Sequence, residues 1–404
     1  MSDFEKELDN LVRTRNLEKE DILNIFKSVV EDSVRKYYNT NVEFQMEKEE
    51  MKVVVYKKVV RKVDNPANEI SIQEAKKYDP QAIEGSEVKV PIQLENLPRA
   101  VIYKILDKFS EKLKDKEKQI VLMDFSKKIG QIVRGKVQRI NKKDNFVVLA
   151  IERSDVEGKL SLNEMLPFEF EKIKQGETKK AVIIGIDEKE KYVLLSRTHP
   201  DFLKKLLEEE IAEILDGTVE IKQVARIPGK RSKVAVFSRE TRIDPVAVVV
   251  GIKGTRLNPI QRELEGEKID IVKWDPDIIK FSVNALQNPH IITAYKLEDK
   301  IYVVVEDDHI GEVKGSEGLN VILASKLIGK DIVILGISEY SKPKNVVTII
   351  EIQKQFPVSV VELLRSSGLY SFNEEPTLAS LYNIGLDEKT ALKLIEFIEE
   401  KLNE

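Results

Sequence analysis

Apolar residues recur at two different spacings along the chain, and the change between them divides the sequence into segments. Within residues 1–40 they recur at helical spacing, as at Ile22, Ile25 and Val29, which predicts helices with one apolar stripe. Three later segments alternate apolar and polar residues and predict half-buried strands, at residues 42–46, 52–60 and 88–94. A further helix is expected from residue 100, ending at the charged run 114–118. Residues 1–126 therefore predict an α/β domain with its own core.

The pattern changes to short strands over residues 127–199. Five apolar segments are separated by turn residues, at 130–137, 145–151, 157–160, 181–186 and 192–196. Five short strands in this arrangement predict a small barrel of the OB type. Such barrels bind single-stranded nucleic acid through a basic groove and exposed aromatic rings, and Phe146, Arg134 and Lys136 are the candidates here. Because inward and outward positions alternate, Phe146 is equally compatible with a place inside the barrel.

Two consecutive segments after the barrel repeat one order of elements: helix, strand, strand, helix, loop, helix, strand. They are expected over residues 200–277 and 278–340. Each carries a G-x-x-G loop between its last two helices. The first loop is Gly251-Ile252-Lys253-Gly254, and the second loop, 64 residues later, is Gly315-Ser316-Glu317-Gly318.

A G-x-x-G loop between two helices is the design of the KH domain, in which glycines let a nucleic-acid strand approach the backbone closely. The helix that follows offers free N–H groups to a phosphate. A single glycine pair also serves as a tight interhelical turn. Two such loops with the same flanking elements form an internal repeat and predict tandem KH domains of the type II order. Residues 341–404 then predict a short C-terminal helical hairpin.

Charge is distributed unevenly between these segments. The chain has a net charge of −4, yet residues 222–256 hold nine basic and two acidic residues, a local charge of +7. A basic stretch in an acidic protein is typical of a phosphate-binding surface. The predicted RNA-binding residues around the first loop are Gly251, Ile252, Lys253, Gly254, Arg256, Arg226, Lys230 and Arg231. Those of the second loop are Gly315, Ser316, Gly318 and Lys314; we expect weaker binding there because Glu317 repels phosphate.

Composition argues against several other classes of protein. The chain has no Cys, which removes disulfides and thiolate metal ligands, and its three His are scattered, so we expect no metal site and no cofactor. No P-loop, Rossmann fingerprint, HExxH or nucleophile elbow is present, and we expect no catalytic residues. The first seven residues are acidic without an apolar core, and no apolar run reaches membrane-spanning length. These features predict a cytoplasmic protein that does not bind membranes.

With a barrel followed by two glycine-loop domains, the chain resembles the NusA family of bacterial transcription factors over nearly its whole length. The segment Val250-Gly251-Ile252-Lys253-Gly254-Thr255-Arg256 is similar to that family's first KH loop. Further similar segments are residues 64–71, 78–80, 195–200, 225–236, 244–246 and 266–271.

The resemblance implies a non-enzymatic elongation factor that modulates pausing, termination and antitermination. Its N-terminal domain would bind RNA polymerase, while the barrel and both KH domains would hold single-stranded nascent RNA. It also implies other antitermination factors and a small-subunit ribosomal protein as further partners, and we expect a monomer.

Two other functions suit the same modules. Phosphorolytic exonucleases that process RNA also carry KH and OB modules, but they usually place KH before the barrel, and residues 1–126 are too few for their large catalytic core. A ribosome-associated RNA chaperone is the second alternative. Co-purification with polymerase or with ribosomes distinguishes these alternatives from a transcription factor.

Overall fold

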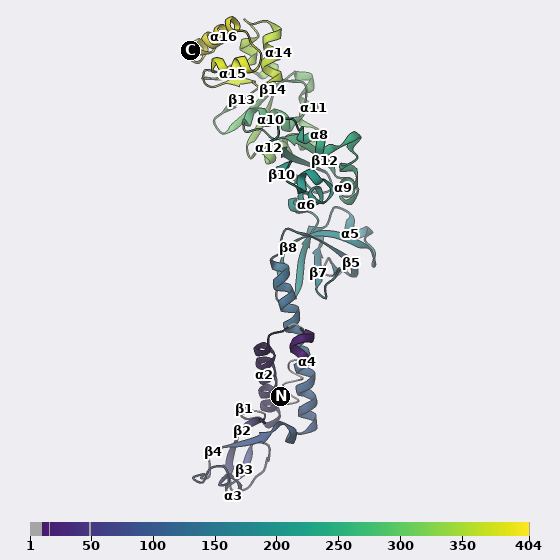
Figure 1. Cartoon of the computed structure of the whole chain (residues 1–404), viewed down its shortest axis with the longest axis vertical. Coiled ribbons are helices and arrows are strands. Elements are labelled where there is room, and N and C mark those ends of the chain that lie inside the picture. The colour runs from purple at the N-terminus through teal and green to yellow at the C-terminus, as the bar shows by residue number, and fades with distance from the viewer. Residues whose placement is uncertain (1–9, 16, 48–49, 404) are drawn as a thin grey trace. The chain divides into compact units, whose positions relative to one another are not determined.

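A computed structural model of the 404-residue chain describes residues 10–15, 17–47 and 50–403 (Figure 1). The part of the predicted N-terminal helical region that falls on residues 1–9 lies outside the described residues. The chain divides into two compact units. Unit 1 comprises residues 1–127 with 186–192, and unit 2 comprises residues 128–185 with 193–404. In the described part of the chain, no helix is both long and apolar enough to cross a membrane.

Unit 1 is an α/β domain in which two long helices accompany a four-stranded sheet. Its elements are α2 (Lys19–Tyr38), β1 (Val42–Glu47), β2 (Glu50–Val60), β3 (Glu69–Ser71), α3 (Ile72–Ala75), β4 (Glu87–Gln93) and α4 (Arg99–Ser126). Strand β2 is central, with β4 along one edge and both β1 and β3 along the other. Helices α2 and α4 lie side by side (Figure 1). Buried Val29, Val53 and Val101 join the helices to the sheet, which confirms the predicted α/β domain.

Helix α4 is longer than its sequence pattern suggested. It was expected to end at residues 114–118 but continues to Ser126. The charged run consists of good helix formers that remain on the solvent side, while Leu113 and Leu122 carry the apolar stripe through it. A run of charges therefore marks a solvated helix face here and not a helix end.

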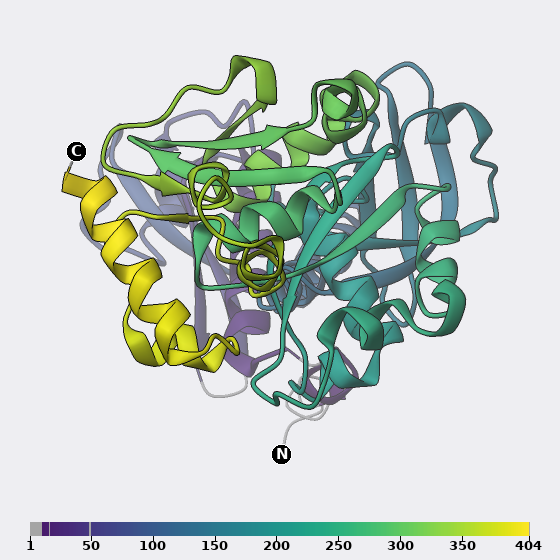
Figure 2. The ribbon, with the colours of Figure 1, turned by 90° about the horizontal axis from the view of Figure 1, so that it is seen from above.

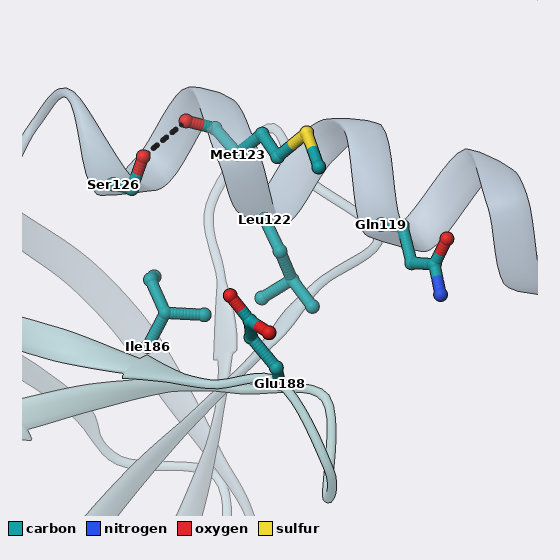
Figure 3. A pocket seen from close by; sticks show the side chains of 6 residues that line it. All are labelled: Gln119, Leu122, Met123, Ser126, Ile186 and Glu188. Carbon is teal, nitrogen blue, oxygen red and sulfur yellow. Dashed lines mark hydrogen bonds between the residues drawn. The ribbon is translucent and has the colours of Figure 1, made fainter.

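The end of α4 contacts the turn at residues 186–192, which belongs to unit 1. Lys191 Nζ lies 2.6 Å from a carboxylate oxygen of Asp115. A pocket of about 300 Å³ is lined by Gln119, Leu122, Met123, Ser126, Ile186 and Glu188 (Figure 3). The Ser126 hydroxyl donates to the Met123 carbonyl at 2.6 Å, so it is held by its own helix. The lining therefore holds one carboxylate, that of Glu188, and one hydroxyl that is already hydrogen-bonded.

Unit 2 begins with the five-stranded closed barrel that the sequence predicts. Its strands are β5 (Ile132–Asn141), β6 (Phe146–Ile151), β7 (Glu157–Ser161), β8 (Thr178–Asp187) and β9 (Tyr192–Ser196), in the order β5-β6-β7-β9-β8. Leu149, Leu160 and Leu195 are among its fully buried residues. Because side chains alternate across each strand, these residues fix which positions point outward.

The two glycine-loop modules that follow have the same topology. The first KH module consists of α6 (Pro200–Glu210), α7 (Ala212–Leu215), β10 (Glu220–Ile227), β11 (Arg231–Phe237), α8 (Pro245–Val250), η3 (Ile252–Gly254), α9 (Leu257–Glu263) and β12 (Lys268–Lys273). The second KH module consists of α10 (Ile278–Leu286), β13 (Ile291–Leu297), β14 (Lys300–Val305), η4 (Asp307–His309), α11 (Ile310–Lys314), η5 (Ser316–Gly318), α12 (Leu319–Ile328) and β15 (Asp331–Gly336). In each, the first two strands are antiparallel and the third is parallel to the second. This confirms the predicted type II order.

A shared core makes the two KH modules one body. Helix α12 of the second module packs on β10 and β11 of the first, where Ala225 and Ala235 face Leu323 and Leu327. The neighbouring Val234 points to the other face of that sheet, into the core formed with α6, α8 and α9. Small side chains on the α12 side allow the helix to lie close, and a larger residue there typically costs about 1–3 kcal/mol through overpacking.

The C-terminal segment is larger than the predicted hairpin. The hairpin is present as α15 (Leu378–Asn383) and α16 (Glu388–Asn403), but β16 (Val347–Thr348), α13 (Ile349–Ile352), α14 (Val358–Ser366) and β17 (Ser371–Phe372) precede it and share its core. Figure 2 shows the yellow C-terminal helices beside the light green strands of the second KH module. Tyr295 and Val304 of that module pack against Ile350, and Thr293 donates to the Tyr370 carbonyl at 2.6 Å. The tail therefore covers the sheet of the second module.

Candidate nucleic-acid interface

The two glycine loops have the same backbone conformation. Gly251 has φ 71° and ψ 175°, and Gly315 has φ 71° and ψ 174°. This region of φ/ψ space is open to glycine alone for practical purposes. A Cβ on Gly251 would also lie 2.9 Å from Cγ of Arg256, and one on Gly315 would lie 3.0 Å from Cβ of Asn320. The first glycine of each loop is thus required both by conformation and by space.

The third residue of each loop is a non-glycine residue in the left-handed region. Lys253 has φ 52° and ψ 31°, and Glu317 has φ 55° and ψ 19°. The closing glycines, Gly254 and Gly318, have φ 77° and 70°. The repeat inferred from the sequence is therefore also a repeat of backbone geometry, and the two loops differ only in the side chains that they carry.

The first loop presents an apolar and a cationic side chain to solvent. Ile252 is 84% exposed, and Lys253 beside it is exposed and forms no ion pair with any described residue. In the second loop Ser316 is exposed, as is Lys314 just before it. These four side chains are therefore accessible from solvent.

Arg256, which follows the first loop, is held by hydrogen bonds to neighbouring elements. Its Nη1 donates to the Glu213 carboxylate at 2.8 Å and to the Val248 carbonyl at 2.9 Å. A backbone hydrogen bond, and next the Arg256 guanidinium, hold the pKa of Glu213 below its ordinary value, so this carboxylate is ionised at neutral pH. The Arg256 side chain is 40% exposed, and a guanidinium has five N–H donors, of which the hydrogen bonds to Glu213 and Val248 use two.

Arg226 is not part of the surface, and its assignment to the RNA-binding patch was wrong. Its side chain is 1% exposed and makes two hydrogen bonds to Glu267, at 2.8 and 2.9 Å, and one to the His199 carbonyl at 3.0 Å. Glu267 also accepts from the backbone N–H of Gly229 at 2.9 Å. A buried charge requires such a partner, so Arg226 holds the β10–β11 hairpin against β12 and cannot contact phosphate.

The Arg231 guanidinium is also paired within the protein. It forms two hydrogen bonds to Asp270, at 2.7 and 3.1 Å, and the buried Lys233 contacts the same carboxylate at 3.1 Å. Burial alone would raise the pKa of Asp270, but the hydrogen bonds and charges of Arg231 and Lys233 outweigh it and lower that pKa. The charge count over residues 222–256 therefore overstates the cationic surface.

Lys230 forms an ion pair with the second loop. Its Nζ lies 2.9 Å from the Glu317 carboxylate, and the two side chains are 54% and 67% exposed. The carboxylate that made the second loop look repulsive is thus neutralised by a cation from the first KH module. Sequence patterns do not reveal this pair, because its members are 87 residues apart.

The predicted barrel residues share one outer face. Arg134 and Lys136 are exposed and alternate with buried Gly135 and Val137 on β5. On β6, Phe146 lies on the opposite face from buried Leu149 and is only partly exposed. Lys159 from β7 places its Nζ 4.8 Å from the centre of the Phe146 ring. The ring therefore lies on the outer surface of the barrel, beside the basic side chain of Lys159.

A buried arginine that the sequence analysis did not single out joins the barrel to the first KH module. Arg197 is 1% exposed and contacts Glu169 of the barrel at 2.9 Å and Glu263 of α9 at 2.7 Å. It also donates to the backbone carbonyls of Lys180, at 2.6 Å, and Glu263, at 2.8 Å. Its partners are distant in sequence. The only sequence signal for this joining role is therefore the position of Arg197 in the junction after β9. The network therefore fixes the barrel relative to α9.

A barrel followed by two fused KH modules defines a multidomain protein of the nucleic-acid-binding class. The NusA-like first KH domain family matches residues 197–274, and the NusA N-terminal domain family matches residues 3–119. The chain is 33% identical over 353 residues to the transcription termination/antitermination protein NusA of Thermus thermophilus, covering 82% of this chain and 89% of that protein. It is 32% identical over 346 residues to the NusA of Halalkalibacterium halodurans, covering 84% and 89%. The solution structure of the N-terminal domain of NusA from Bacillus subtilis matches 27% of this chain and 92% of its own length, at 22% identity and a TM-score of 0.20.

The chain belongs to the NusA family of transcription termination/antitermination proteins. The resemblance inferred from the loop motifs is confirmed. The family consists of transcription factors without enzymatic activity, which selects this class over the exonuclease and the ribosome-associated chaperone.

Proposed function

We propose that this chain binds RNA polymerase through its N-terminal domain and single-stranded nascent RNA through the barrel and both KH modules. Tethering to polymerase holds the RNA-binding surfaces at high effective concentration near the transcript, so weak individual contacts suffice. The observation that carries the proposal is the pair of glycine loops with one backbone conformation on a single packed body.

The first loop supplies most of the electrostatic affinity in this proposal. Lys253 and the solvent side of Arg256 contact phosphates, and exposed Ile252 contacts a base or a sugar. The N–H groups at the start of α9 face the same backbone. Gly251 and Gly254 keep the loop free of side chains at its closest approach to RNA.

The second loop extends the same strand. Gly315, Ser316 and Gly318 offer backbone and hydroxyl donors, and Lys314 offers a charge. When RNA arrives, a phosphate replaces Glu317 as the partner of Lys230, so that one cation serves both loops. Affinity at this loop is therefore lower than at the first, since an existing ion pair must be broken.

The barrel contributes a third contact. Arg134 and Lys136 follow the RNA backbone, while the outer face of Phe146 stacks on a base. Arg197 keeps this face in register with the first loop.

We also propose a polymerase-docking surface in the N-terminal domain. Tyr103 and Leu106 on α4 are 67% and 55% exposed. Leu106 lines an apolar pocket of about 300 Å³ together with Phe26, Val30, Leu94, Glu95, Leu97, Ile102 and Ile105. Exposed apolar side chains beside an apolar pocket are typical of a protein interaction site.

The finer features inferred from the sequence belong to this proposal. They are a division into domains at residues 1–126, 127–199, 200–277, 278–340 and 341–404, a cytoplasmic location, a monomeric state, and contacts with other antitermination factors and a small-subunit ribosomal protein. The tail covers the sheet of the second KH module, so we assign it a protein-contact or packing role.

Two full-chain variants separate the two halves of the proposal. Leu106→Asp should abolish co-purification with RNA polymerase and leave RNA binding unchanged, whereas Lys253→Asp should weaken RNA binding and leave the polymerase interaction unchanged. Ile83→Asp, at a 69% exposed apolar position outside the pocket, is the matched control for an added charge. If Lys253→Asp binds RNA as tightly as the unmodified chain, the proposed RNA site is wrong.

A further inference from the structure

Two of the three histidines in the chain lie against one another. The rings of His290 and His309 stack with centroids 3.5 Å apart and planes 6° from parallel. They are 19 residues apart in sequence, His290 directly before β13 and His309 at the end of η4. The expectation that the histidines are scattered is therefore wrong for this pair, and the argument against a metal site that rested on it fails.

Two carboxylates complete the cluster. Glu306 lies 3.9 Å from Nδ1 of His290 and 3.5 Å from Nε2 of His309, and Glu312 lies 3.2 Å from Nδ1 of His309. Glu306, His309 and Glu312 form an E-x-x-H-x-x-E pattern, in which residues three apart share one helical face. His290 reaches this face from a different element.

Asn288 orients the cluster from outside. Its amide nitrogen donates to Glu312 at 3.3 Å, and its amide oxygen accepts from the backbone N–H of His290 at 2.8 Å. Hydrogen bonds of this kind fix the direction of metal ligands in proteins. The cluster therefore has candidate metal-binding residues and also a neighbouring residue, Asn288, that holds two of them by hydrogen bonds.

We propose that His290, His309 and Glu312 bind one divalent transition-metal cation, with Zn²⁺ as the best match. Two imidazole nitrogens and one carboxylate oxygen, with a water molecule in the fourth position, form a donor set that Zn²⁺ and Co²⁺ accept, whereas Mg²⁺ prefers oxygen alone. Ligand atoms of His290, His309 and Glu312 already lie within 4.8 Å of one another. Around a tetrahedral cation with bonds of about 2.1 Å, ligand atoms are roughly 3.4 Å apart, so these three ligands must move closer together to bind one cation.

Binding requires the stacked rings to splay, because a cation lies in the plane of each imidazole that binds it. His290 and His309 are 34% and 31% exposed, which leaves room for a rotation about χ2. The cation would connect the start of β13 to α11, the helix that ends directly at Gly315.

The proposal concerns metal binding and stands whether or not the second loop binds RNA. It is tested on the untagged full chain by calorimetric titration with Zn²⁺ and by the visible absorption of bound Co²⁺. We expect one equivalent of either metal, and no displacement by excess Mg²⁺. His290→Ala and His309→Ala should abolish this binding, and Glu312→Gln should weaken it by about tenfold or more.

His199→Gln is the matched control, because His199 is the third histidine and its side chain caps α6 instead. This variant should bind metal as the unmodified chain does. The proposal is overturned if no saturable uptake of Zn²⁺ or Co²⁺ is found. It is equally overturned if Mg²⁺ displaces Co²⁺, or if His199→Gln loses as much binding as His290→Ala.

Discussion

The ion pair between Lys230 and Glu317 joins the hairpin of the first KH module to the loop of the second, and Glu317→Gln is the change that tests its role. Both side chains are more than half exposed, at 54% and 67%. Exposed pairs contribute about 0–1 kcal/mol to stability, so the variant should fold normally. Its effect should instead appear in RNA binding, where Glu317 is expected to oppose a phosphate.

The size of that effect follows from charge and distance. A carboxylate about 6 Å from a phosphate in water costs roughly 0.7 kcal/mol. Removing it also frees Lys230 for the phosphate, a gain of similar size. Together these give about 1–1.5 kcal/mol, or roughly five- to twelvefold tighter binding. One additional cation on a single strand should steepen the dependence of log affinity on log salt by about 0.7.

The assay is fluorescence anisotropy of a labelled single-stranded RNA over a range of salt concentrations. It compares the unmodified chain with Glu317→Gln, Lys230→Gln and the double variant. Glu298→Gln is the control for net charge, because Glu298 is exposed in the β13–β14 turn of the same module. Lys230→Gln should weaken binding more strongly when Glu317 is already replaced, since Lys230 is then free to meet phosphate.

Two results would refute this reasoning. The first is a Glu317→Gln variant that binds RNA no more tightly than Glu298→Gln. The second is a Lys230→Gln effect of equal size in both backgrounds, because independent effects would mean that the pair does not compete with RNA.

The remaining predictions concern the loops, the buried arginine and the tail. Lys253→Asp should weaken RNA binding by more than Ser316→Asp in the same anisotropy assay, and equal losses would contradict the ranking of the loops. Arg197→Met should lower the free energy of unfolding by about 1–3 kcal/mol in urea titrations followed by circular dichroism, because the carbonyls of Lys180 and Glu263 lose this donor and buried Glu169 keeps only Lys179 as a cationic partner; an unchanged midpoint would show that the network is not needed. Burial raises the pKa of Tyr340 from 10.0 to about 12. The unfolded chain therefore loses this proton first as pH rises, and stability falls from about pH 10 to about pH 12. Tyr340→Phe should reduce that fall by at most about 2.7 kcal/mol, and identical alkaline profiles for both chains would contradict it.

Local patterns in the sequence predicted the element order well. The five barrel strands and both KH modules follow from alternation, helical spacing and glycine position, because these signals act over a few neighbouring residues. Gly251 and Gly315 were informative for a physical reason: their backbone conformation excludes other residues. The repeat of that requirement identified the family before any packing was known.

The same patterns gave wrong predictions where contacts between residues distant in sequence determine the structure. Arg226 counted as a surface cation but is buried on Glu267, which lies 41 residues away. The charged run in α4 suggested a helix end. The helix continues through it because buried residues before and after the run pack against the rest of the unit. In the tail, short segments such as β16 and α13 are too brief to show a period and exist because they cover the second KH module.

The sequence by itself determined the elements, their order and the positions of both glycine loops, because hydrophobic period and glycine conformation are properties of neighbouring residues. Only the tertiary structure decided which charges face solvent. Ion pairs such as Lys230–Glu317 and the stacked His290 and His309 join residues that are distant in the chain, and their formation depends on how α12 packs against the first module's sheet and how the strands pair. A charge that is buried or paired loses its affinity for RNA, so the binding surface is a result of packing and cannot be counted from composition.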